Sequence, residues 1–338
     1  MQISRSTWFS ALLRWMLLLA VLIVPEVVRG AQLWNATVGA QTNDKGRQAL
    51  AFLPNEIWIH AGDSIAWRFD ADDIHTVTFL TSDQVRPPFP NGCPGFSSSP
   101  ATFDGSHCVS APPSVKGQTF TVFFPTAGNF KLVCLVHENM TGTVHVLNLS
   151  QPLPHNQDFY DDQAADQRHD LLSDTDGNDD ADRQEHSDHA AHHSNNAHVV
   201  TAGIGEISAT AGGSQTLSVV RFKDDEIEIH AGQTVEWNNQ DPVTPHTITF
   251  GAEPANLFPP SGNVTVDADG ALHAVITSPS DSAHSGFIVA APQERLGLPQ
   301  SPLGFTRFRV TFPKAGVFPY ICALHDNLGM KGMVIVHP

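Results

Sequence analysis

The chain has 338 residues, of which 41% are hydrophobic, and it carries 18 basic against 35 acidic side chains, a net charge of −17. This length allows two domains. The excess of acid argues against binding to nucleic acid or to anionic membrane surfaces. A redox partner protein of basic charge suits such a surface, although acidity alone also keeps an exported protein soluble.

The first 30 residues are typical of a secretory signal peptide. Arg5 and Arg14 precede the ten apolar residues 15–24, and small residues follow at Gly30 and Ala31. This order of charge, apolar run and cleavage region is that of an exported protein. Ten apolar residues are too few to span a bilayer, although an uncleaved anchor is an alternative. We therefore expect a periplasmic or secreted protein with no integral membrane segment after signal removal.

A first domain is predicted over residues 31–150. Residues 55–69 alternate apolar and polar side chains around the turn Ala-Gly-Asp, which is typical of two strands. His75 lies in Ile-His-Thr-Val-Thr-Phe, and Cys134 ends the apolar run Phe-Lys-Leu-Val-Cys. His137 and Met140 follow within the same short loop. Four potential metal donors therefore lie at the ends of predicted strands.

A second domain, residues 199–338, repeats the first. The Ile-His-Ala-Gly turn recurs, as does a Phe-Pro-x-Ala-Gly segment before the strand that ends in cysteine. The same four donor types return in the same order: His246, Cys322, His325 and Met330. This is duplication of a whole domain rather than a short structural repeat. Short strands separated by Gly and Pro, without a long helical period, predict two antiparallel β-sandwiches and an all-β fold.

Each set of donors contains one thiolate, two imidazoles and one thioether. Two His, one Cys and a weak axial Met form the ligand set of blue-copper electron-transfer sites. Zinc also binds Cys and His, and a buried structural thiol or a core methionine is the plain alternative for any one residue. The repetition of the whole set favours two copper sites, one of His75, Cys134, His137 and Met140 and one of His246, Cys322, His325 and Met330.

These motifs also carry a family resemblance. The segment Phe-Pro-Tyr-Ile-Cys-Ala-Leu-His-Asp-Asn-Leu-Gly-Met-Lys-Gly resembles the copper loop of the plastocyanin family of cupredoxins. The first copy is similar to the shorter loop of amicyanin-like members. The resemblance implies a tandem of Greek-key cupredoxin β-sandwiches, with His137 and His325 as the ligand edges nearest to solvent. We also expect the backbone N–H groups of Thr76 and Thr247 to bond the cysteine sulfurs.

The two remaining cysteines, Cys93 and Cys108, lie in one loop of the first domain. In an exported protein such a pair is expected to form a disulfide. Two free thiols are the alternative. The disulfide would close a long loop and take no part in the chemistry.

Residues 151–198 differ in composition from both flanks. They contain 11 Asp and seven His but few apolar residues, so we expect a disordered acidic, His-rich linker. Its cluster of His186, His189, His192 and His193 is a candidate for binding Cu(II) or zinc. Oxygen donors in 174–185 are spaced like those of a calcium loop, but the glycine is misplaced for the turn. A plain linker is the default interpretation.

The sequence therefore predicts a protein that transfers single electrons and is not an enzyme. A periplasmic copper carrier or reservoir is the alternative, which differs in releasing its metal readily. A two-domain copper oxidase or nitrite reductase is a distant third. Those families need a His beside the ligand Cys or His-x-His pairs, whereas Val133 and Ile321 precede the cysteines and no His-x-His occurs.

Overall fold

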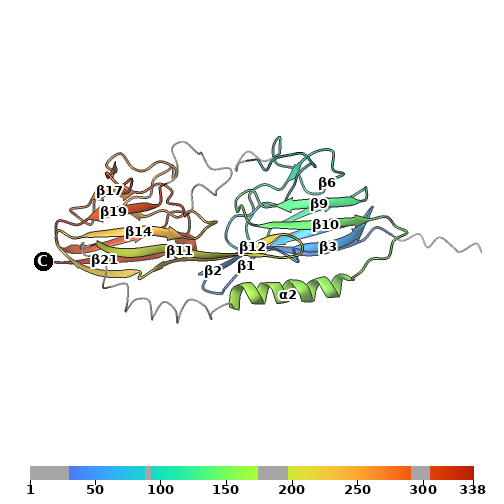
Figure 1. Cartoon of the computed structure of the whole chain (residues 1–338), viewed down its shortest axis with the longest axis horizontal. Helices are drawn as coiled ribbons and strands as arrows, with labels where there is room; N and C mark the ends of the chain where they lie inside the picture. Colours follow the sequence, from blue (N-terminus) through green and yellow to red (C-terminus); the bar gives the residue numbers. More distant parts are fainter. Residues whose placement is uncertain (1–29, 88–92, 174–196, 291–304) are drawn as a thin grey trace, which may run out of the picture. The chain divides into compact units, whose positions relative to one another are not determined.

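The computed structural model describes residues 30–87, 93–173, 197–290 and 305–338, and these residues form mainly β-strands (Figure 1). In the first half the strands are β1 Leu33–Gln41, β2 Arg47–Leu53, β3 Glu56–His60, β4 Ser64–Phe69, β5 Thr78–Phe79, β6 Ala101–Thr102, β7 Val109–Ser110, β8 Thr119–Phe123, β9 Gly128–Val133 and β10 Thr141–Leu147. In the second half they are β11 Ala197–Ala209, β12 Ser214–Lys223, β13 Glu226–His230, β14 Thr234–Gln240, β15 Thr249–Phe250, β16 Thr265–Val266, β17 Leu272–Val275, β18 Ala283–His284, β19 Arg307–Thr311, β20 Gly316–Ile321 and β21 Lys331–His337.

The predicted strands around the Ala-Gly turn are confirmed in both halves. In β4, Ile65, Trp67 and Phe69 are buried while Arg68 between them is exposed. This alternation follows from the period of two in a strand, which turns successive side chains to opposite faces. The inward residues therefore build the core, in which Trp34, Trp67 and Trp237 are among the largest fully buried side chains.

Each half has its own hydrophobic core between two β-layers. A five-stranded sheet, β3-β10-β9-β5-β7 in the first half and β13-β21-β20-β15-β18 in the second, faces part of an 11-stranded sheet. The all-β class is thus confirmed. The sheets are mixed rather than purely antiparallel, because β1 pairs parallel to β4 and β3 parallel to β10. Between β1 and β4 the chain passes through β3 in the opposite sheet, which supplies the crossover that parallel neighbours need.

The two halves are joined by strand pairing as well as by the chain. Strand β12 pairs antiparallel with β2, with Leu217 opposite Ala49 and Thr216 opposite Leu50, so that one sheet runs through both halves (Figure 1). Thr143 Oγ1 donates a hydrogen bond of 2.8 Å to the Gly212 carbonyl beside this seam. Residues Gln32–Pro338 consequently form one compact unit. The sequence does not determine whether the two sandwiches contact each other, and the β2–β12 pairing shows that they do.

The prediction of disorder throughout 151–198 is wrong for its first part. Residues Gln157–Ser173 form helix α2, which contacts β1 and β2. Tyr160 is fully buried, and its hydroxyl accepts a 2.9 Å hydrogen bond from the Trp58 backbone N–H. Arg168 pairs with Asp70 at 2.7 Å. Two anchors of this kind hold a helix whose composition alone could not support a core.

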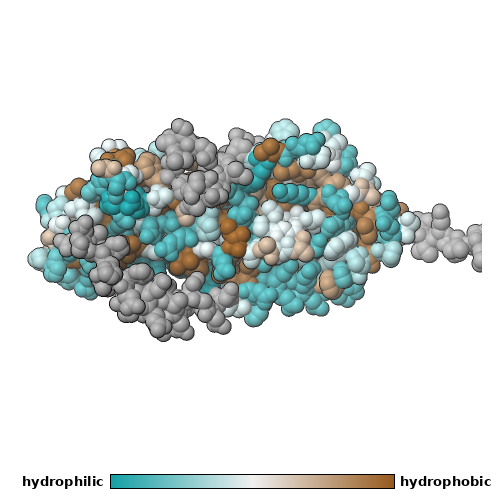
Figure 2. All heavy atoms as spheres, viewed as in Figure 1, coloured by the Kyte–Doolittle hydropathy of each residue, from teal (hydrophilic) through white to brown (hydrophobic). Residues whose placement is uncertain are grey.

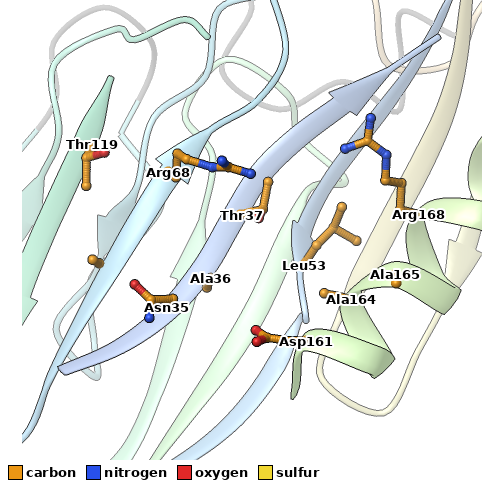
Figure 3. Close-up of a pocket in the computed structure, with 11 residues that line it drawn as sticks. Asn35, Ala36, Thr37, Leu53, Arg68, Thr119, Asp161, Ala164, Ala165 and Arg168 are labelled. Carbon is orange, nitrogen blue, oxygen red and sulfur yellow. The ribbon is translucent and has the colours of Figure 1, made fainter. Parts of the chain in front are cut away.

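Figure 3 shows how α2 covers the strands. Asp161, Ala164, Ala165 and Arg168 of the helix lie opposite Thr37, Leu53 and Arg68 across a groove of about 530 Å³. On the face drawn in Figure 2, hydrophobic residues form small separate patches among hydrophilic ones, an ordinary surface for a globular protein.

Three further expectations concern the ends and loops. Cys93 and Cys108 form a disulfide, as predicted. Residues 1–29, which contain most of the signal segment, and the cluster of His186, His189, His192 and His193 lie outside the described residues. Among the helices of the described ranges, none is long and apolar enough to cross a membrane.

Candidate metal centres

The first predicted set comes together at one end of the first half. His75, just before β5, and Cys134 and His137, just after β9, place their ligand atoms within 4.8 Å of one another. The Nδ1 atoms of the two histidines are 3.1 Å apart, and His137 Nδ1 lies 3.9 Å from Cys134 Sγ. All three side chains are buried. Two imidazole nitrogens and one cysteine sulfur that converge this closely are donors of the kind that bind soft metal ions.

The second set repeats this arrangement. His246, Cys322 and His325 also place their ligand atoms within 4.8 Å. Cys322 Sγ lies 3.8 Å from His246 Nδ1 and 3.4 Å from His325 Nδ1. The first histidine of each set is fixed by backbone pairing with a neighbouring segment, His75 with Ser114 and His246 with Ile288. Both sets therefore use the same strand ends and the same ring nitrogens.

The two methionines close the loops behind the cysteines. Cys134 N donates to the Met140 carbonyl at 2.9 Å, and Cys322 N donates to the Met330 carbonyl at 3.0 Å. Both methionine side chains are fully buried and belong to the cores of their halves. The longer second loop takes up its extra residues in a short 3₁₀ turn, Asp326–Leu328. Each loop thus returns its methionine to the strand that carries the cysteine.

The expected backbone bonds to sulfur are confirmed. Thr76 N–H points at Cys134 Sγ at 3.5 Å, and Thr247 N–H at Cys322 Sγ at 3.4 Å. The same threonines accept bonds through Oγ1 from the residues that follow the cysteines, at 2.8 Å from Leu135 N and 2.7 Å from Ala323 N. A single threonine therefore orients both the sulfur and the start of the loop, which is how outer groups tune a metal site.

A glycine with left-handed backbone packs against the first histidine of each set. Gly39, in β1, has φ +66°, and a Cβ placed on it would lie 2.5 Å from His75 Nε2. Gly203, in β11, has φ +81° and meets His246 Nε2 even more closely. Both lie where the strand register shifts, as in a β-bulge. Sequence reasoning missed these residues, although a glycine inside an apolar strand is a signal of close backbone approach.

The electrostatics of both sets favour a thiolate. Burial alone would raise the pKa of the Cys134 thiol, but the facing His137 and His75 hold it well below its ordinary value. Burial opposes ionisation of Cys322 in the same way, and His325 and His246 again lower its pKa. The thiolate is the form that binds a metal. These donors, their burial and their convergence fit copper.

Asp73 is a functional residue that sequence reasoning missed. It is 8% exposed, and its Oδ2 lies 3.3 Å from His137 Nε2, an ion pair too poorly aligned to count as a full hydrogen bond. Burial lowers the pKa of His137, but Asp73 outweighs it and raises that pKa to about 10. The corresponding position in the second half is Thr244. The only sign of its role in the sequence is that an acidic pair ends two residues before His75, whereas no acidic pair occupies the corresponding positions before His246.

Two arginines hold the copper-binding loops and were also missed. Arg86 donates to the carbonyls of Cys134, at 3.1 and 3.0 Å, and Leu135, at 2.7 Å. Arg221 donates to the Leu328 carbonyl at 2.9 Å and to the Asp44 carbonyl at 2.5 Å. The second arginine therefore ties the loop of the second half to the first half. Long side chains that reach across the fold leave no local pattern in the sequence.

The loop histidines are less exposed than the family resemblance implied. His137 is 2% exposed and His325 is 5% exposed. Both line one cavity of about 440 Å³ that lies between the loops of the two halves. The groove under α2 is larger, but none of its lining residues belongs to either metal-binding set. The chemistry therefore lies at the smaller cavity.

Comparison with known proteins agrees with this geometry. Residues 208–337 match the family described as copper binding proteins, plastocyanin/azurin family. Among solved structures, a Cu(I) form of an amicyanin mutant is 18% identical, with 44% of this chain and 89% of that chain covered and a TM-score of 0.24. Oxidised plastocyanin from Dryopteris crassirhizoma is 18% identical over 41% and 99%, with a TM-score of 0.20. TM-scores this low add nothing to the argument. No curated protein matches the chain.

Proposed function

Taking the chain as a cupredoxin-like protein with two copper-binding groups, we propose that it is an exported blue copper protein that transfers one electron at a time. The observation that supports this most directly is the repeated His–Cys–His group with its buried methionine, held by the same threonine bonds in both halves. Two His, one Cys and a weakly bound Met are the donors of blue-copper electron-transfer sites.

The protein's contribution is a rigid set of donors. Bound copper would supply the one-electron couple between Cu(II) and Cu(I). His75 and His246, fully buried and fixed by backbone pairing, cannot swing away. Cys134 and Cys322 connect the site covalently to β9 and β20, and the threonine N–H groups stabilise their thiolate charge. Rigid outer contacts of this kind limit how far the ligands move when the charge changes.

The proposal also covers the cellular compartment of the protein and its redox partner. A disulfide in the first half suits an oxidising compartment, so we infer a periplasmic or secreted protein. The net charge of −17 suits a basic redox partner protein, because opposite charge steers association. We infer no enzymatic turnover by the chain itself.

A copper carrier or reservoir is the second candidate function. It is favoured by the same soft donors, which also select copper for storage. The burial of all six imidazole and thiolate ligands argues for tight retention rather than ready transfer, because a carrier must expose its metal to the acceptor. Lability separates the two functions.

The test is copper content together with the visible spectrum of mature protein that is loaded with Cu(II) and desalted. Two coppers per chain with intense thiolate-to-copper absorption are expected. One blue copper would mean that one half has lost the chemistry, and Cys134→Ser and Cys322→Ser would identify it. Colourless or readily lost copper would refute electron transfer and favour the carrier.

A further inference from the structure

The two loop histidines border the same cavity. In both, Nδ1 faces the cysteine sulfur, at 3.9 Å for His137 and 3.4 Å for His325. The opposite edge of each ring, which carries Nε2, is therefore the edge away from the metal. Both residues line the 440 Å³ cavity, and both are almost completely buried. The ring edges through which an electron could leave each site therefore border the cavity between the two halves.

The cavity is enclosed mainly by apolar side chains from both halves. The copper-binding loops contribute aliphatic residues, and the long insert of the second half, 251–304, contributes a leucine and aromatic residues. These wall residues are Leu135, Val136, Leu257, Phe258, Phe287, Leu324 and Leu328. An apolar surface around a ligand histidine serves electron transfer because it excludes water and allows close approach. Here residues of both halves supply that surface.

One carboxylate of the first half lines the cavity that both histidines border. Asp73 lies 3.3 Å from His137 Nε2 and lines the cavity that also contains His325. Its Oδ1 accepts a 2.7 Å bond from Ile74 N, which fixes its orientation. A charged residue of the first half therefore lies in the wall of the cavity that His325 of the second site also lines.

Direct contacts hold the halves in this arrangement. The β2–β12 pairing places them in one sheet. Arg221 joins the Leu328 carbonyl, in the second copper-binding loop, to the Asp44 carbonyl of the first half. Since Leu328 and His325 lie in the same loop, the contact fixes the loop itself and not only the domain. These contacts within the described fold thus place the two histidines at one cavity.

We propose that the two copper sites exchange electrons directly with each other across this cavity, along a path from His137 to His325 beside Asp73. The inference rests on the proposed function, because it requires copper in both sites. One electron leaves Cu(I) in one half and reduces Cu(II) in the other, so the oxidation states are swapped. No proton or atom is transferred, and no further reactant is needed. Asp73 is a positioning residue in this scheme.

The first experiment follows exchange in the full chain loaded with two coppers. The loops differ in length, so the two sites should differ in spectrum, and Cys134→Ser and Cys322→Ser supply the reference spectrum of each site. After a flash that reduces a small fraction of the copper, the spectrum should relax toward equilibrium at a rate independent of protein concentration. A rate proportional to concentration would overturn the proposal. Absence of blue colour in both single-site variants would instead refute the proposed function.

A second measurement needs no electron transfer. In fully oxidised protein, two Cu(II) ions on opposite sides of one small cavity should broaden each other's electron paramagnetic resonance signals. The single-site variants should show unbroadened signals. Identical line shapes in the full chain and the single-site variants would overturn the proposal.

The role of Asp73 is tested against its neighbour Asp72. Asp73→Asn removes a charge that lies 3.3 Å from His137 Nε2 in the shared cavity, and the reduction potentials of both sites should rise because a nearby negative charge stabilises Cu(II). Asp72→Asn removes an equal charge from the same cavity wall, but the Asp72 side chain is 29% exposed, so solvent screens its charge and both potentials should shift less than in Asp73→Asn. Slower exchange is expected only for Asp73→Asn. A shift confined to the first site would refute the shared role.

Discussion

Replacing Gly39 by alanine should damage the first copper site specifically. The added Cβ would lie 2.5 Å from His75 Nε2 and 2.9 Å from Ala71 Cβ. Alanine in the left-handed region costs roughly 1–2 kcal/mol, and overpacking of a filled core costs typically about 1–3 kcal/mol more. We therefore expect the free energy of unfolding of the copper-free protein to fall by about 2–5 kcal/mol.

Gly62→Ala is the matched control. Gly62 also has positive φ, at +93°, but a Cβ there meets nothing within 4 Å. This variant should lose only the backbone contribution, roughly 1–2 kcal/mol, and should keep both coppers. Chemical denaturation of the copper-free proteins measures the first quantity, and copper content with visible absorption measures the second.

The expected result is a larger stability loss for Gly39→Ala and loss or distortion of one of two blue bands. The Cys322→Ser background sharpens the assay, because only the first site then contributes colour. Equal stability losses in the two variants, with normal copper binding by Gly39→Ala, would refute the argument that Gly39 is required for His75 to reach its position.

Three other predictions concern individual buried or loop-binding side chains. Tyr160→Phe should lower the free energy of unfolding by about 1–2 kcal/mol, because the part-buried Trp58 N–H loses its partner; an unchanged denaturation midpoint would contradict this. Arg86→Met removes three bonds to the Cys134 loop and should speed copper loss from the first site to a chelator while sparing the second; equal loss from both would argue against it. Burial raises the pKa of Tyr160 to about 12 and also raises that of Tyr320. The folded protein, with only these two tyrosines, should therefore show little tyrosinate absorption until well above the ordinary pKa of about 10, and stability should fall as pH rises through that window. Titration of urea-unfolded protein is the control, and coincident curves would refute the burial argument.

The sequence was most informative where chemistry and local pattern coincide. His75 and Cys134 could be paired because His75 lies just before a recognisable strand and Cys134 ends another, and the second copy repeats this order. The strands around the Ala-Gly turns were predictable from their period of two. The threonine bonds to sulfur could be anticipated because Thr76 directly follows a ligand, so its backbone N–H must lie nearby.

The missed features depend on contacts between distant residues. Helix α2 lies in a stretch with too few apolar residues to predict a helix, and it depends on Tyr160, which docks against residues 102 positions earlier. The β2–β12 pairing has no local signature, because any exposed strand edge offers the same backbone groups. Asp73 appeared to be one acid among many in an acidic chain. Only its position beside His137 distinguishes it.

The β2–β12 pairing also bears on how the tandem stays soluble. In β2, Gln48, Ala49 and Leu50 are fully buried beneath their partner strand. A half expressed alone would present this strand as an open edge with apolar side chains, which is a template for association between copies. Each half therefore shields the other from aggregation, and the duplicated domain is better regarded as one folding and expression unit than as two separable proteins.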